Sequence, residues 1–205
     1  MSKNKKTIFW AISIPIMSIA IAGTLIASIL FLMNKSEPPP PARVRAFKVF
    51  SENSEKTCYA VVYQELEDKL ICMSVAHYFK NNPPPYHIDL NVREITDIKI
   101  PDQKRDIAFF SVDKTGLARG RDFDVPVFVT NVEPASPITI YNDEIYKIPR
   151  RKIEQVNVGE RSFLLNGIVA QGRSGSPAFI PDTNRCIGVV SGYFEKKQQT
   201  LVLAP

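Results

Sequence analysis

Apolar and polar side chains alternate in short stretches through most of residues 43–205. In residues 43–51, for example, Phe47 and Val49 share one side of the pattern and Lys48 falls on the other. A period of two places neighbouring side chains on opposite faces of a strand, and no window has a convincing apolar stripe at helical spacing. The predicted strands cover residues 43–51, 57–64, 69–76, 87–95, 106–112, 125–130, 138–141, 150–158, 162–170, 178–181, 186–192 and 200–204. Many short strands separated by turns are typical of sandwiches or closed barrels, so the domain is predicted to be all-β.

The N-terminal part has a different pattern. Ile8 to Met33 is a run of 26 residues without an ionisable side chain, and it follows a basic head, residues 1–7. At about 1.5 Å per residue a helix of this length exceeds the roughly 30 Å core of a bilayer, so residues 8–33 are predicted as a transmembrane helix. A cleaved signal peptide is the alternative, because residues 20–22 (Ala-Ile-Ala) have the small-x-small pattern. The apolar run continues well beyond them, which favours an uncleaved anchor.

A proline-rich linker, residues 34–43, follows this run. Pro38 to Pro41 favour the extended polyproline II conformation, which makes a stiff spacer. Residues 44–205 then remain for a soluble domain with a sizeable core. Basic residues flank the apolar run on both sides, so they orient it weakly. A short basic head before a large C-terminal domain favours a single-pass protein with that domain on the extracytoplasmic (periplasmic or extracellular) side.

The net charge limits the kinds of binding partner that are expected. The net charge is +5, and without the three N-terminal lysines about +2 remains. This charge is too small for a surface that binds the phosphate backbone of a nucleic acid. No nucleic acid partner is therefore expected, whereas residues 8–33 would contact the lipid bilayer.

Cys58 and Cys72 lie on consecutive predicted strands and could form a disulfide or be two reduced core residues. Cys186 sits in an apolar strand and is expected in the core.

A glycine-rich segment, residues 172–177 (Gly-Arg-Ser-Gly-Ser-Pro), joins two predicted strands and carries Ser174. A serine hydroxyl becomes a nucleophile when a histidine takes its proton, and that histidine needs a carboxylate to orient it. His77 ends one predicted strand and Asp106 opens another, while His87 is expected as a partly exposed strand residue. The order His, Asp, Ser excludes the α/β-hydrolase and subtilisin arrangements. Taken alone, each residue is as consistent with a structural role as with catalysis. Neither histidine pairs with a C-x-x-C motif, so no metal site is predicted.

Three motifs in this order resemble those of one enzyme family. Residues 74–77 (Ser-Val-Ala-His), 106–109 (Asp-Ile-Ala-Phe) and 172–177 resemble the T-A-A-H, D-I-A-L and G-D-S-G-G-P segments of trypsin-like (chymotrypsin-fold) serine peptidases. The match covers most of residues 44–204, and the G-x-S-G-S-P variant is most similar to the bacterial glutamyl-endopeptidase and HtrA-like branches. The resemblance implies two six-stranded antiparallel β-barrels, a site in the cleft between them, and no cofactor.

The same resemblance assigns expected roles to individual residues. Ser174 would be the nucleophile, His77 the general base and then acid, and Asp106 the partner that fixes the imidazole tautomer. The backbone amides of Gly172 and Ser174 would form the oxyanion hole. The residues expected to bind substrate are Ile168, Val169, Ser191, Gly192 and Tyr193.

Departures from the family affect activation and specificity. Arg173 stands where trypsins carry an aspartate, so activation through a salt bridge from a newly cut N-terminus is not expected. Ile168 replaces an acidic residue of trypsins, and Val190 aligns with the histidine of glutamyl endopeptidases. A basic or glutamate residue before the scissile bond (position P1) therefore finds no counter-charge. Tyr193 is expected to narrow the pocket, so a small or medium apolar P1 residue is predicted.

Two functions of different classes follow from these features. The first is a membrane-anchored serine endopeptidase that acts on proteins or peptides, including membrane or exported proteins, through an acyl-enzyme intermediate. The second is a catalytically weak or inactive trypsin-like fold that serves as a membrane-tethered binding or scaffold module. A domain of this length is short for two barrels, which supports the second function.

Overall fold

The computed structural model describes residues 45–142, 146–170 and 172–205. The predicted basic head, transmembrane helix and linker, residues 1–7, 8–33 and 34–43, lie outside these ranges. Within the described ranges, no helix is both long and apolar enough to cross a bilayer. The described residues form one compact unit.

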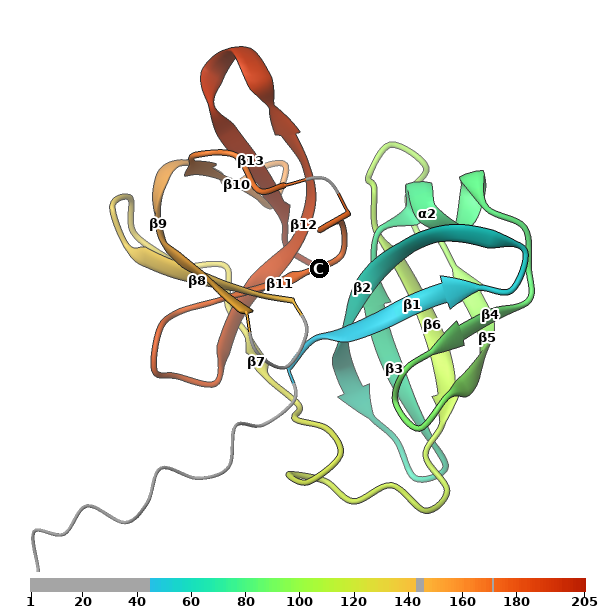
Figure 1. Ribbon diagram of the computed structural model, residues 1–205. Helices are drawn as coiled ribbons and strands as arrows, with labels where there is room; N and C mark the ends of the chain where they lie inside the picture. The colour runs from blue at the N-terminus through green and yellow to red at the C-terminus, as the bar shows by residue number, and fades with distance from the viewer. Residues whose placement is uncertain (1–44, 143–145, 171) are drawn as a thin grey trace, which may run out of the picture. The chain divides into compact units, whose positions relative to one another are not determined.

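The first half of this unit is a closed antiparallel barrel with the strand order β1-β2-β3-β6-β5-β4. One short helix, α2 (Ala76–Asn81), follows the third strand. The six strands are β1 (Phe47–Ser51), β2 (Ser54–Glu65), β3 (Lys69–Ser74), β4 (Tyr86–Ile88), β5 (Arg93–Lys99) and β6 (Ala108–Asp113). This barrel lies beside a second one (Figure 1).

The second half is a sheet with the order β11-β8-β9-β10-β13-β12-β7, in which β11 also pairs with β12. That pairing closes six antiparallel strands into a ring, and short β7 adds a parallel pairing to β12. A 3-10 turn, η1 (Glu195–Lys197), joins the last two strands. The strands are β7 (Val127–Phe128), β8 (Pro137–Asn142), β9 (Tyr146–Asn157), β10 (Ser162–Asn166), β11 (Pro177–Phe179), β12 (Arg185–Phe194) and β13 (Gln199–Leu203). The prediction of an all-β domain with two six-stranded antiparallel barrels is therefore confirmed.

Each barrel encloses its own apolar core. Leu70 and Phe110 are buried in the first core, and Phe163 and Leu165 are buried in the second. The first core also takes in side chains from strands of the second barrel: Phe179, Cys186, Val189 and Leu203. This shared packing holds the two barrels against each other.

The three cysteines are all free and buried. Of the two alternatives for Cys58 and Cys72, the structure therefore has the reduced one, and Cys186 lies in the core as expected. Burial raises the pKa of Cys58 and of Cys186 to about 12, and it also raises the pKa of Cys72. Thiols with such pKa values carry almost no nucleophilic thiolate near neutral pH.

Several strand boundaries differ from the sequence prediction. The strand predicted at 69–76 ends at Ser74, and the chain turns into helix α2. The strand predicted at 87–95 is two strands separated by a turn, in which Asn91 and Val92 have positive φ angles of 53° and 47°. The strands predicted at 125–130 and 162–170 shorten to Val127–Phe128 and Ser162–Asn166. A six-residue helix is too short to show a helical period, which is why alternation alone missed α2.

Candidate active site

His77 is placed by the junction between β3 and α2. The Ser74 hydroxyl at the end of β3 donates to the Tyr59 carbonyl oxygen of β2 at 2.5 Å, and Val75 and Ala76 are completely buried. The next residue, His77, lies in the first turn of α2 and keeps 43% of its side chain exposed. The prediction that His77 lies at the end of a strand is therefore wrong, because His77 lies in helix α2. The anchored β3 end nevertheless fixes where the imidazole emerges.

Asp106 holds His77 through both of its carboxylate oxygens. The backbone N–H of His77 donates to Asp106 Oδ1 at 2.7 Å, and Nδ1 of the ring lies 2.6 Å from Asp106 Oδ2. The first of these bonds satisfies an N–H at the start of α2 that has no partner within the helix. The second requires the proton on Nδ1 when Asp106 is ionised, so Nε2 is left as the basic nitrogen.

A third donor reaches the same carboxylate from the second barrel. The hydroxyl of Ser191, on β12, donates to Asp106 Oδ2 at 2.7 Å. Burial alone would raise the pKa of Asp106, but the hydrogen bonds from His77 and Ser191 and the charge interaction with His77 outweigh it. The net effect lowers the pKa of Asp106 below its ordinary value, so the carboxylate is ionised at neutral pH.

The segment that carries Ser174 is tied to both barrels. Tyr59 N–H on β2 donates to the Ser174 carbonyl oxygen at 2.8 Å, and Gly175 N–H donates to the Val190 carbonyl oxygen on β12 at 2.7 Å. Gly172 and Gly175 have φ angles of 80° and 84°, a left-handed conformation that glycine adopts without strain. The sequence therefore supplies glycine where the backbone turns around the half-buried Ser174.

A cavity of about 210 Å³ lies against Ser174. Four of the five residues predicted to bind substrate line it, whereas Ile168 does not. Among the described residues, the lining has no acidic side chain and is formed by Val169, Ala170, Gly172, Arg173, Ser174, Val190, Ser191, Gly192 and Tyr193. Because Ser191 both lines this cavity and donates to Asp106, the cavity and the His77–Asp106 pair belong to one site.

Within the described residues, no hydrogen bond joins the Ser174 hydroxyl to His77. Such bonds are often long without substrate and shorten in the Michaelis complex. His87, the other histidine, pairs with Glu52 at 2.8 Å and stacks on Phe50 with 5.6 Å between ring centroids. His77 is thus the histidine that the fold brings to the cavity region. In the part of the chain that the structure describes, no cluster of His, Cys, Asp and Glu side chains could hold a metal ion.

Sequence reasoning assigned Ser191 to substrate binding but missed its bond to Asp106. The two residues are 85 positions apart, and no local pattern links them. The contacts of Tyr59 with the Ser174 segment were missed for the same reason, because Tyr59 is an ordinary aromatic residue in an alternating strand. Only the packing of the two barrels brings these groups together.

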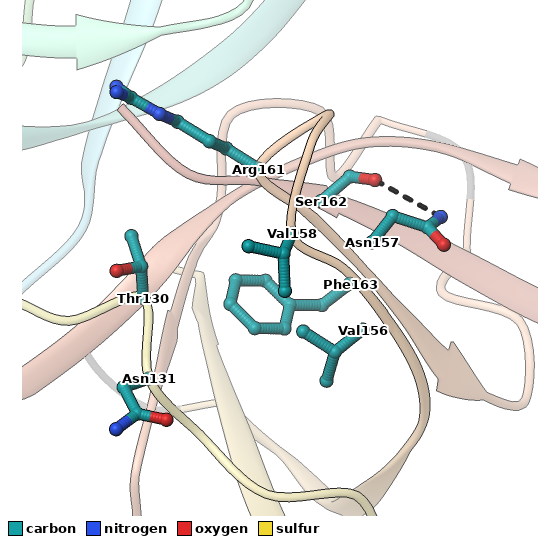
Figure 2. A pocket seen from close by; sticks show the side chains of 8 residues that line it. All are labelled: Thr130, Asn131, Val156, Asn157, Val158, Arg161, Ser162 and Phe163. Carbon is teal, nitrogen blue, oxygen red and sulfur yellow. Dashed lines mark hydrogen bonds between the residues drawn. The ribbon is translucent and has the colours of Figure 1, made fainter.

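The described part of the domain also has two larger cavities. One of about 550 Å³ also borders Asp106 and Ser191. The other, of about 520 Å³, contains no predicted site residue, and Figure 2 shows its apolar side chains gathered opposite Thr130 and Asn131. Its lining consists of Thr130, Asn131, Val156, Asn157, Val158, Arg161, Ser162 and Phe163.

No known protein family matches the sequence, and neither does any curated protein. Solved structures do match the fold. The catalytically active tobacco etch virus protease in complex with product superposes with a TM-score of 0.60 at 12% identity, over 84% of this chain and 77% of that chain. The active form of the Rv3671c protease from M. tuberculosis gives 0.58 at 16% identity, over 80% and 77%.

An inactivated protease shares the fold as well. The scabies mite inactivated protease paralogue S-I1 matches with a TM-score of 0.56 at 12% identity, over 80% of this chain and 89% of that chain. The fold is therefore chymotrypsin-like, and it is shared with both active and inactivated proteases. At such identities the likeness concerns the fold, so chemistry has to be argued from the side chains of this chain.

Proposed function

We propose that this chain is a serine endopeptidase in which Ser174, His77 and Asp106 act together. The observation that carries the proposal is the pair of hydrogen bonds between Asp106 and His77, one to the backbone N–H and one to Nδ1. These two bonds fix both the position and the tautomer of the imidazole. A histidine with only a structural role would not need its tautomer fixed. It occurs on a chymotrypsin-like fold, beside a cavity that Ser174 lines.

The reaction would proceed in two halves. Nε2 of His77 takes the proton of the Ser174 hydroxyl while Oγ attacks the scissile carbonyl carbon, and the imidazolium then gives this proton to the leaving amine. An acyl-enzyme ester remains on Ser174. Water then attacks the ester, with His77 again as base and then as acid, and releases the carboxylic acid product.

The charges that develop in this reaction have partners in the site. The ionised Asp106 stabilises the imidazolium formed on His77 without taking its proton. Backbone amides of Gly172 and Ser174 are proposed as donors to the tetrahedral oxyanion, and one such donor is worth about 2.7–4 kcal/mol in related chemistry. Gly172 suits this role because nothing lies within 4 Å of the position of a Cβ there, which leaves its backbone approachable.

Specificity is proposed to reside in the cavity beside Ser174. Its volume of about 210 Å³ and its lining by Val169 and Val190, with no acidic side chain among the described lining residues, suit a small or medium apolar P1 residue. Tyr193 is 40% exposed and borders this cavity. The cavity of about 550 Å³ next to Asp106 offers room for further substrate residues.

We also propose that residues 8–33 anchor the protein in a membrane, with the peptidase domain on the extracytoplasmic side. The support is the 26-residue run without an ionisable side chain. Membrane or exported proteins near the bilayer would then be the nearest substrates.

A second candidate function is a scaffold without turnover. Two observations favour it: the described residues show no bond between Ser174 and His77, and an inactivated protease paralogue has the same fold. In such a protein the cleft would bind peptides without cutting them.

A fluorophosphonate probe separates the two functions. We expect it to label the full chain in detergent micelles, and to lose labelling in the variants Ser174→Ala and His77→Ala. His87→Ala serves as the matched control, because His87 pairs with Glu52, and it should label like the wild type. Circular dichroism checks that each variant is folded. A folded wild type that takes up no label would reject the peptidase and favour the scaffold.

A further inference from the structure

Tyr59 of β2 touches the segment that carries Ser174 at three points. Its backbone N–H donates to the Ser174 carbonyl oxygen at 2.8 Å. Its own carbonyl oxygen packs so closely on Gly175 that a Cβ there would lie 1.8 Å away. Its hydroxyl accepts a hydrogen bond from Nη1 of Arg173 at 3.2 Å. Three successive residues of the segment, 173–175, are thus held by one residue of the other barrel.

Tyr59 is itself firmly placed. It pairs with Lys48 across β1 and β2 and is only 4% exposed. Its carbonyl oxygen also accepts the bond from Ser74, three residues before His77. Tyr59 therefore connects the segment of Ser174 with the strand end that positions His77.

The side chain of Arg173 points to this anchor. Besides the hydrogen bond, its guanidinium carbon lies 6.0 Å from the centroid of the Tyr59 ring, at the outer range of a cation–π contact. Arg173 stands between Gly172 and Ser174, whose amides are the proposed oxyanion donors. Rotation of the peptide plane between Arg173 and Ser174 would turn the Ser174 amide away, and movement of the backbone at Arg173 would displace the neighbouring Gly172. A tethered Arg173 side chain opposes both changes.

From these contacts we infer that Tyr59 and Arg173 are positioning residues, which form an inter-barrel clamp that holds the oxyanion amides in their productive orientation. The inference rests on the proposed function and deepens it. The clamp is built from side chains of the folded domain, so it needs no newly cut N-terminus. It differs from a substrate contact by Arg173, which would affect binding rather than the chemical step.

The test uses Tyr59→Phe, which removes the hydroxyl and keeps the ring, and Arg173→Met, which removes the guanidinium. Tyr63→Phe is the matched control, because Tyr63 lies on the same strand and contacts Phe109 and Phe128 instead. Two measurements are made on the full chain in micelles. One is the hydrolysis of an N-acetyl-alanine p-nitrophenyl ester, resolved into kcat and KM. The other is hydrogen exchange of the Gly175 and Ser176 amides.

For Tyr59→Phe we expect kcat to fall about tenfold with KM unchanged, because the loss concerns the transition state. Exchange at Gly175 and Ser176 should rise about tenfold, whereas the urea midpoint and the Tyr63→Phe control should stay at the wild-type values. The double variant should lose no more than Arg173→Met, since both changes break one contact.

Other outcomes separate the clamp from the proposed function. If the wild type hydrolyses no ester but Tyr59→Phe still raises exchange at Gly175 and Ser176, the peptidase proposal fails and the clamp stands. If the wild type is active and Tyr59→Phe changes neither kcat nor exchange, the clamp is overturned. A rise in KM alone for Arg173→Met would also overturn it, and would make Arg173 a substrate contact.

Discussion

Gly175 packs directly on the backbone of the first barrel, so Gly175→Ala tests how the Ser174 segment is seated. A Cβ at this position would lie 1.8 Å from the Tyr59 carbonyl oxygen, 2.7 Å from its carbonyl carbon and 2.8 Å from the Ser74 hydroxyl. The backbone φ angle of 84° is also one that alanine adopts only with strain. The obstructing atoms belong mainly to the backbone of a strand in a closed barrel, so they cannot move aside cheaply.

The expected loss of unfolding free energy has two parts. The left-handed conformation costs about 1–2 kcal/mol for a residue with a Cβ. Overpacking against a rigid neighbour adds about 1–3 kcal/mol. The total of roughly 2–5 kcal/mol is a large share of the 5–15 kcal/mol typical of a domain, and corresponds to a fall in Tm of roughly 4–20 °C.

Gly120→Ala is the matched control. Gly120 has a similar φ angle of 78°, but nothing lies within 4 Å of a Cβ there. Its substitution should cost only the conformational part, about 1–2 kcal/mol. Urea and thermal unfolding of both variants, followed by far-ultraviolet circular dichroism, measure the difference. Equal losses in the two variants would show that Gly175 does not pack on Tyr59, and would refute the described seating of the Ser174 segment.

Three further predictions concern the thiols, the carboxylate and the pocket. Burial raises the pKa of Cys58, Cys72 and Cys186, so Ellman's reagent at pH 8 should titrate no thiol in the native protein and all three in guanidinium chloride; fast native reaction of any one would contradict this burial. Asp106→Asn should slow fluorophosphonate labelling by about 10⁴, because the imidazole loses its tautomer control. The pKa of Asp106 is lowered by folding, so its contribution to stability exists above its ordinary value of 3.8 and is lost as the pH falls through the folded value. Unfolding curves between pH 2 and 5 should therefore depend less on pH in Asp106→Asn than in the wild type, and identical curves would argue against the described bonds. Gly192→Val should narrow the cavity beside Ser174 and lower kcat/KM for a phenylalanine P1 ester about tenfold more than for an alanine one; equal losses would place P1 elsewhere.

The architecture was largely readable from the sequence. Alternating apolar residues predicted an all-β domain because a strand that is half buried must expose every second side chain. The barrel count came from motif resemblance, and the strand pairing confirms it. Helix α2 was missed, since the backbone N–H of His77 in its first turn bonds to Asp106, which lies 29 positions away in the sequence. A helix that depends on so distant a partner leaves no local signal.

The candidate site divides in the same way. In the sequence, the glycine-rich segment singled out Ser174, and chain order together with motifs that resemble those of trypsin-like peptidases singled out His77 and Asp106. The partners of these residues could not be read there. Ser191 reaches Asp106, and Tyr59 reaches the Ser174 segment, only because two separately cored barrels pack against each other.

Local chemistry thus set which elements form and which side chains can react, since both depend on near neighbours along the chain. The state of the thiols, the shape of the cavity and the orientation of each reacting group came from the packed fold. These properties depend on distances between residues that are far apart in the chain, and such distances exist only after both barrels have closed and docked.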